Sequence, residues 1–147
     1  MKTKLCLLIL LIVGLSVQLS ANPINGLLER IDKGASKKFV IEFKKGADDF
    51  FELDQKGTKV VVRGNNYVNI ATGINWYLKY YAGIQLSWNG MQAKLPQVLP
   101  PVPRKERHET SLSLRYDFNY CTYSYTMAFW DWERWEKEID WMALHGI

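Results

Sequence analysis

The sequence predicts a mixed fold in which a small α+β domain is followed by a single β/α unit. Two observations support this prediction. Three short segments rich in β-branched and aromatic residues precede an amphipathic helical segment between residues 39 and 83. A proline-rich stretch from residue 95 then separates that region from one alternating segment and one further amphipathic helix. The first region is close to the minimum size for an independent core.

Residues 1–21 have the layout of a secretory signal peptide. Lys2 and Lys4 precede an apolar run, Leu5–Leu15, and the small-residue region Ser16–Ala21 follows it. The apolar run is shorter than the ~18 residues that a membrane-spanning helix needs, so export is favoured over a retained anchor. We therefore predict a protein exported to the periplasm or the extracellular space, with no stable membrane span after cleavage.

Charge and cysteine content limit the possible functions of the mature chain. The formal net charge is +4, and loss of Lys2 and Lys4 with the signal lowers it to +2, so nucleic acid is not predicted as a partner. Cys6 leaves with the signal, and Cys121 then remains alone. The mature chain is therefore predicted to have no internal disulfide and to be stabilised by packing.

The predicted α+β domain covers residues 22–94 and begins with helical and strand patterns. A short helix is expected within 22–34, because apolar side chains recur on one side of it. Three short strands are expected at 39–43, 49–53 and 59–63, because turn residues separate these β-branched and aromatic runs. The last two strands are expected to form a hairpin.

A second helix of this domain is expected to lie across the sheet. Asn65 or Asn66 is suited to cap its first turn, and Gly83 is suited to end it. Apolar residues at three- and four-residue spacing define its buried face, namely Val68, Ala71, Ile74, Leu78 and Tyr81. A further short strand is predicted at 84–88.

Residues 95–110 are predicted to be an interdomain linker, and residues 111–147 a β/α unit. Four of the five prolines lie in the linker, where they disfavour both helix and central strand. The alternating segment at 112–121 then predicts a strand in which Asn119 and Cys121 project to the same side. One strand and one helix cannot bury their own apolar faces, so we expect these residues to be the N-terminal part of a longer protein.

The last helix is predicted to begin after Asp131, which can cap it. One face carries the pairs Glu133 with Lys137 and Arg134 with Glu138, at a spacing that supports a helix. The other face is an apolar stripe expected to be core, namely Trp132, Trp135, Ile139 and Met142. The acidic residues of this helix are interpreted as a solvated face, namely Glu133, Glu136, Glu138 and Asp140.

Aromatic residues in the loop after the predicted strand could stack on the C–H face of a sugar. Tyr123, Tyr125 and Trp130 are the candidates, and core packing is an equally good interpretation of them. Asp117 and Glu109 are the acidic groups nearest to the strand, but nothing in the pattern supplies the second carboxylate that glycoside hydrolysis requires. His108 and His145 have no suitably spaced partners, so neither a metal nor a cofactor is predicted.

Two patterns in fixed register make the chain recognisable. The first is Asn119-x-Cys121-Thr122-x-Ser124-Tyr125, and the tryptophan-rich run from Trp130 to Leu144 follows it. This stretch resembles the opening of the catalytic barrel in the α-N-acetylglucosaminidases of glycoside hydrolase family 89. The preceding region also resembles the small N-terminal domain of that family, in particular along Tyr67–Leu78.

The resemblance implies an exo-acting hydrolase that removes terminal α-linked N-acetylglucosamine with retention of configuration. It implies that residues 111–147 begin a (β/α)8 TIM-type barrel, with two catalytic glutamates on later strands. It also implies that Asn119 and Cys121 bind the terminal sugar of a carbohydrate substrate. A closed barrel needs eight such units, so we expect these 147 residues alone to be inactive and poorly soluble.

Two alternatives belong to other functional classes. A secreted carbohydrate-binding module without catalysis would use Tyr123, Tyr125 and Trp130 as a stacking platform. A structural or adhesive role for the small domain is the third hypothesis, and no feature of the sequence selects for it.

Overall fold

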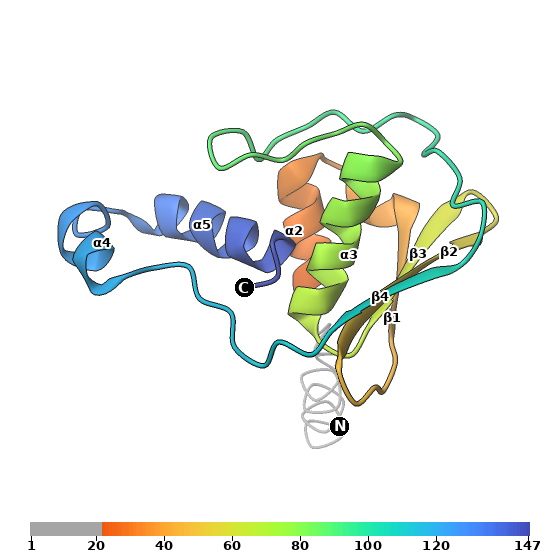
Figure 1. Ribbon diagram of the computed structural model, residues 1–147. Coiled ribbons are helices and arrows are strands. Elements are labelled where there is room, and N and C mark those ends of the chain that lie inside the picture. Colours follow the sequence, from red (N-terminus) through yellow and green to blue (C-terminus); the bar gives the residue numbers. More distant parts are fainter. Residues whose placement is uncertain (1–21) are drawn as a thin grey trace, which may run out of the picture.

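The computed structural model describes residues 22–147 as a mixed α/β structure; the predicted signal peptide at 1–21 lies outside the described residues. A four-stranded sheet is covered on one face by a helix, two further helices pack against that helix, and a short helix lies at the far end of the molecule (Figure 1). The elements are α2 (Pro23–Ile31), the 3₁₀ helix η1 (Ala35–Lys38), β1 (Phe39–Phe43), β2 (Asp49–Lys56), β3 (Lys59–Gly64), α3 (Tyr67–Tyr80), β4 (Glu106–Thr110), α4 (Tyr120–Tyr125) and α5 (Trp132–Leu144).

Helix α2 confirms the helix predicted near the start of the mature chain. The side chain of Asn22 caps it by accepting a hydrogen bond from the backbone N–H of Ile24 at 3.0 Å, and Pro23 occupies the first helical position. Its apolar side is buried through Ile24, Leu27, Leu28 and Ile31. This side packs into the same core as the sheet.

The sheet has the order β1-β3-β2-β4, and all three predicted strands of the hairpin region are present. The predicted hairpin is confirmed, because β2 pairs antiparallel to β3, whereas β1 pairs parallel to β3. One face of the sheet contributes Phe51, Leu53, Val60 and Val62 to the core. These residues alternate along the strands, as a sheet with one buried face requires.

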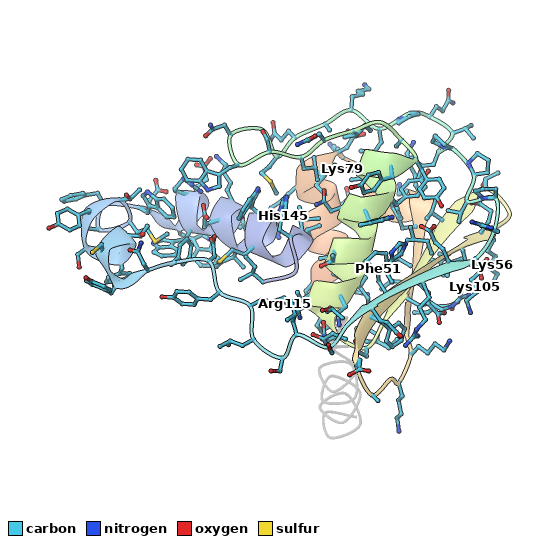
Figure 2. All side chains as sticks on the ribbon, in the orientation of Figure 1. Phe51, Lys56, Lys79, Lys105, Arg115 and His145 are labelled. Carbon is cyan, nitrogen blue, oxygen red and sulfur yellow. The ribbon has the colours of Figure 1, made fainter. Side chains whose placement is uncertain are left out.

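The face of the sheet away from that core contains Glu52, whose buried carboxylate meets three cations. The ammonium groups of Lys44 and Lys105 lie 2.7 and 3.0 Å from its oxygens, and the guanidinium of Arg107 lies at 3.1 Å. Burial opposes ionisation of Glu52, but these cations outweigh burial and lower its pKa to about 2. Lys105 lies at the end of the molecule remote from α5 (Figure 2).

Helix α3 crosses the sheet as predicted, and Asn66 caps it by accepting from the backbone N–H of Asn69 at 2.8 Å. A Cβ at Gly73 would lie 2.9 Å from Cγ1 of Val62, so glycine allows the helix to approach the sheet closely. Gly83 adopts a positive φ of 66° and follows the end of the helix. The buried residues of α3 are Asn69, Ile70, Ala71, Gly73, Ile74, Tyr77 and Leu78.

The prediction of a strand at 84–88 is wrong. The segment forms a loop closed by one isolated bridge between Ser87 and Gly90. Leu86 is buried and joins the hydrophobic core. The segment therefore buries its apolar side chain without pairing to a sheet edge, and the loop arches over α2 and α5 (Figure 1).

The prediction of an interdomain linker at 95–110 is also wrong, because this segment is part of the domain. Leu95, Leu99 and Val102 are buried in the core, and the hydroxyl of Tyr77 donates to the carbonyl of Pro100 at 2.5 Å. Residues 106–110 then form β4, which pairs antiparallel to β2 at the edge of the sheet. The prolines prevent regular structure in this segment, as expected, but apolar side chains between them anchor it to the domain.

The strand predicted at 112–121 is replaced by irregular backbone and the short helix α4. A strand requires a neighbouring strand for its backbone hydrogen bonds, and none lies beside this segment within the described part of the chain. The local cap formed by Asn119 then starts a helix. Helix α5 begins where predicted, since Asp131 accepts from the backbone N–H of Arg134 at 2.9 Å.

Candidate functional site

The candidate sugar-binding residues Asn119 and Cys121 lie at the start of α4. Oδ1 of Asn119 accepts hydrogen bonds from the backbone N–H and the hydroxyl of Thr122, each at 3.0 Å. Both candidate side chains are exposed, and Cys121 is a free thiol. The prediction that they share one side of a strand is wrong, because Asn119 caps α4 and Cys121 is its second residue. Residues two apart in a helix do not face the same side, although both side chains lie in the exposed first turn.

The aromatic candidates of the same loop differ in environment. Tyr123 and Tyr125 are 66% and 79% exposed, so neither is core in this structure. Trp130 packs edge-on against Trp135 with ring centroids 5.1 Å apart, and the guanidinium of Arg134 lies 3.9 Å from its ring centroid. The two tyrosines are therefore available for stacking, whereas the ring of Trp130 already contacts the ring of Trp135 and the guanidinium of Arg134.

The two faces of α5 differ at four positions from the prediction of the sequence analysis. Trp132 and Ile139 of the predicted core stripe are exposed, whereas Glu138 and Asp140 of the predicted solvated face are buried. The predicted i, i+4 pairs of this helix are both confirmed. The buried side of α5 therefore includes two carboxylates, whereas Trp135 and Met142 of the apolar stripe are half-buried and Glu133 of the predicted solvated face is exposed.

Each buried carboxylate of α5 is held by a residue from the N-terminal region. Asp140 receives two hydrogen bonds from the guanidinium of Arg30 on α2, at 2.6 and 2.7 Å. Glu138 accepts from the indole N–H of Trp88 and from the guanidinium of Arg134, both at 2.7 Å. Ionic and charge-assisted contacts of this kind satisfy carboxylates that burial would otherwise destabilise.

Two further contacts attach the last 37 residues to the domain before them. The side-chain amide of Asn75 on α3 donates to the carbonyl of Leu144 at 3.0 Å, and Leu144 is fully buried. The guanidinium of Arg115 pairs with Asp49 on β2. Figure 2 shows Arg115 beside the sheet and His145 at the end of α5. The start of α4 is thus tethered on both sides by elements that pack on the domain.

No catalytic carboxylate pair is assembled by the acidic residues that the sequence analysis considered. Glu109 forms an ion pair with Arg107 at 2.9 Å, and Asp117 is exposed. The ring of His108 packs against those of Phe51 and Trp76, which also contact each other. Within residues 22–147, no group of three or more metal-ligating side chains lies together, and no helix is long and apolar enough to cross a membrane.

Two family models match the chain. The model of the N-terminal domain of α-N-acetylglucosaminidase matches residues 22–101. The model of the TIM-barrel domain of the same enzyme matches residues 115–147. The fold is therefore that N-terminal domain followed by the start of a TIM-barrel domain, and the chain belongs to the α-N-acetylglucosaminidase family.

Individual relatives agree with this assignment. Human α-N-acetylglucosaminidase is 40% identical over 116 residues, which are 79% of this chain and 16% of that protein. A family 89 glycoside hydrolase from Clostridium perfringens, solved as a double glutamate-to-glutamine variant with its substrate GlcNAc-α-1,4-galactose, is 38% identical with a TM-score of 0.81. The structure of the same enzyme in complex with 2-acetamido-1,2-dideoxynojirmycin matches with a TM-score of 0.76. Each of these two matches covers 86% of this chain and 15% of the enzyme. This chain thus spans about one sixth of the length of these relatives.

Proposed function

We propose that these residues form the N-terminal part of an exported exo-glycosidase that hydrolyses terminal α-linked N-acetylglucosamine with retention of configuration. The observation that supports it best is the match of both regions, in order, to the two successive domain models of one enzyme family. The relatives support the substrate class, because the solved family 89 enzyme is in complex with GlcNAc-α-1,4-galactose.

Retaining hydrolysis requires two carboxyl groups about 5 to 5.5 Å apart, one as acid/base and one as nucleophile. We propose that both are glutamates of later barrel strands, outside residues 22–147. In this mechanism the residues of the present chain bind the sugar. Loops at the C-terminal ends of barrel strands form the active site of such enzymes, and Asn119 and Cys121 belong to the first of these loops.

We propose that Asn119 and Cys121 contact the terminal sugar. Oδ1 of Asn119 is occupied by Thr122, which fixes the amide and leaves its N–H groups free to donate to a sugar oxygen. Cys121 is exposed and small, so it can lie against the sugar without blocking it. A rigid donor beside a small contact residue is suited to hold one ring in one orientation.

The first test uses the complete coding sequence that contains the codons for these residues. We expect the encoded protein to release the aryl group from an aryl α-N-acetylglucosaminide, and residues 22–147 alone to show no turnover. Asn119→Ala in the complete protein is expected to lower kcat/KM by about tenfold to a hundredfold, as loss of a hydrogen bond to a sugar would. Asn25→Ala, an exposed asparagine on α2, is the matched control.

The outcomes separate the parts of the proposal. A coding sequence that stops at Ile147 would contradict the proposal that these residues belong to a glycoside hydrolase. An active enzyme unaffected by Asn119→Ala would contradict only the site. N-terminal sequencing of the exported protein tests the signal peptide, for which a new terminus near Asn22 is expected.

A non-catalytic carbohydrate-binding module is the second candidate, and the exposure of Tyr123 and Tyr125 favours it. Residues 22–147 alone would then bind N-acetylglucosamine oligosaccharides, and Tyr125→Ala would weaken that binding by about tenfold. Absence of an effect of Tyr125→Ala would exclude this platform.

A further inference from the structure

A cavity of about 520 Å³ lies between α2, the loop after α3 and α5. This volume is within the range typical of small-molecule sites. Residues from all three elements line it, including Arg30, Trp88, Asn89, Gln92, Glu133 and Lys137. None of these residues belongs to the loop of Asn119 and Cys121.

Trp88 is the aromatic residue of this cavity, and its orientation is fixed. Its indole N–H donates to the buried carboxylate of Glu138 at 2.7 Å, and the guanidinium of Arg134 lies 4.7 Å from the ring centroid. Neither Glu138 nor Arg134 lines the cavity, so the cavity meets a part of the ring that they do not cover. The residue is 46% exposed, so a rigid apolar surface faces the solvent.

The two cations that line the cavity, Arg30 and Lys137, are already paired with carboxylates of its lining, and the remaining carboxylate, Glu29, accepts hydrogen bonds from Gly34 and Ser36. Arg30 binds Asp140 at 2.6 Å and Glu136 at 3.5 Å, and Lys137 binds Glu133 at 2.8 Å. An anion would meet the remaining excess of carboxylates, and a cation would compete with these ion pairs. A neutral ligand that uses hydrogen bonds avoids both costs.

Uncharged hydrogen-bonding groups lie beside the tryptophan. Asn89 and Gln92 are exposed, and within the described residues neither side chain makes a hydrogen bond to protein. Each amide offers both donors and acceptors, which matches the mixed character of sugar hydroxyls. A fixed aromatic surface flanked by free amides is the combination that binds a pyranose ring.

We propose that this cavity is a binding site for a neutral oligosaccharide, with Trp88 as its stacking surface and Asn89 and Gln92 as its hydrogen-bonding groups. The site does not depend on the proposed hydrolase activity. It differs from the aromatic loop of Tyr123 and Tyr125, so the two can be tested separately.

The test is titration of the chain, followed by the indole N–H signals in ¹H–¹⁵N spectra, with Trp88→Phe used to assign the Trp88 signal. The neutral probes are N,N′-diacetylchitobiose and maltotriose, with glucosamine as the cationic probe and glucuronate as the anionic probe. We expect a neutral probe to shift the Trp88 signal with a Kd of about 1 mM, typical of a small solvent-exposed site. Glucosamine and glucuronate are expected to bind at least about tenfold more weakly.

Two variants and a matched control test the assigned residues. Gln92→Ala is expected to weaken binding by about threefold, measured on the Trp88 signal. Trp88→Ala is expected to weaken it by at least about tenfold, measured on the backbone amide signals of residues 89 to 92, and far-ultraviolet circular dichroism checks that each variant is folded. Gln85→Ala, an exposed glutamine of the same loop outside the cavity, is expected to have no effect. If Trp88→Ala does not fold, Asn89→Ala combined with Gln92→Ala decides in its place.

Four results would overturn the proposal. They are no shift of the Trp88 signal at any neutral probe concentration, tighter binding of a charged probe, equal binding by Gln92→Ala and Gln85→Ala, and loss of binding, followed by the backbone amide signals, in Tyr125→Ala but not in Trp88→Ala.

Discussion

Residues 22–110 and residues 111–147 contain ten aromatic side chains each, although the second region is less than half as long, and they bury them to different extents. In the first region Phe50, Phe51 and Tyr77 are buried. In the second region Tyr116, Tyr120 and Phe129 are each more than 70% exposed. Burial of an aromatic ring therefore depends here on whether a sheet and a covering helix are both present, and only the first region has both.

The two regions are alike in their local structure. Asn66 caps α3 and Asp131 caps α5 with the same side-chain contact to the third residue of each helix. Helix formation at α5 thus follows from residues within the helix and its cap, whereas burial of its apolar stripe requires other elements. The comparison teaches that capping and packing are separable in this chain.

The largest effect is expected from truncation of an isoleucine in one region and not in the other. Ile74→Ala should lower the free energy of unfolding by about 3 to 4 kcal/mol, because Ile74 on α3 is fully buried. Ile139→Ala should change it by less than about 0.5 kcal/mol, because Ile139 is 45% exposed and alanine favours a helix. Urea denaturation of the two variants measures both values. Equal costs would mean that the stripe of α5 is packed in solution.

A smaller effect is expected at Glu52. Glu52→Gln should cost about 2 to 3 kcal/mol, since it leaves Lys44, Lys105 and Arg107 without their shared carboxylate and these cations are partly exposed. The folded-state pKa of about 2 lies below the value of about 4.3 for an unfolded glutamate. The contribution of the ionised Glu52 to the free energy of unfolding is therefore complete above about pH 4.5 and is lost as the pH falls towards 2.

Acid denaturation of the wild type and Glu52→Gln tests this pH dependence. The difference in stability between the two should be largest near neutral pH and should shrink through the acidic window. Glu109→Gln is the matched control, because Glu109 pairs with the same Arg107 but is exposed. A pH-independent difference would refute the role of the Glu52 charge.

The contact between Arg30 and Asp140 connects the two regions directly. Arg30→Ala should cost about 1 to 2 kcal/mol, because Asp140 is buried whereas Arg30 is partly exposed. The loss should be local, with faster hydrogen exchange at amides of α5 and little change in the sheet. Arg104→Ala removes an exposed arginine that makes no ion pair within residues 22–147 and serves as the control. Uniform acceleration across the sheet would argue against a local tether.

The smallest effect concerns the cap of α5. Asp131→Ala should destabilise that helix by about 1 kcal/mol, because the backbone N–H of Arg134 loses its acceptor. Fraying of the first turn should appear in Cα chemical shifts, while α3 stays unchanged. Asp131→Asn should retain most of the helix, and failure of this rescue would mean that charge rather than capping matters.

Elements determined by nearby residues were predictable from the sequence. The strands at β1, β2 and β3 and the caps at Asn66 and Asp131 follow from alternation and from residues within one turn. Strand β4 was missed because its signal is its partner β2, which lies more than 50 residues earlier in the chain. The four prolines before it favoured a linker, but their apolar neighbours Leu95, Leu99 and Val102 indicated burial.

The buried carboxylates were missed for the same reason. Glu138 and Asp140 occupy helix positions that suit solvent, and only Trp88 and Arg30, 50 and 110 residues away, explain their burial. The assignment of Asn119 and Cys121 came from the family resemblance and remains a prediction. Its geometric basis changed from strand alternation to a helix cap, because the extended segment has no partner strand in the described chain.

The late position of β4 in the sequence has a consequence for synthesis of the protein. A nascent chain emerges from its N-terminus, so the β2–β3 hairpin and α3 are complete before Glu106–Thr110 leave the ribosome. During that interval the outer edge of β2 has unpaired backbone groups, and such an edge is a template for pairing with another chain. Glu52 on β2 and its partner Lys44 are both synthesised before β4, and these charged side chains would discourage association at that edge until β4 arrives with Lys105 and Arg107.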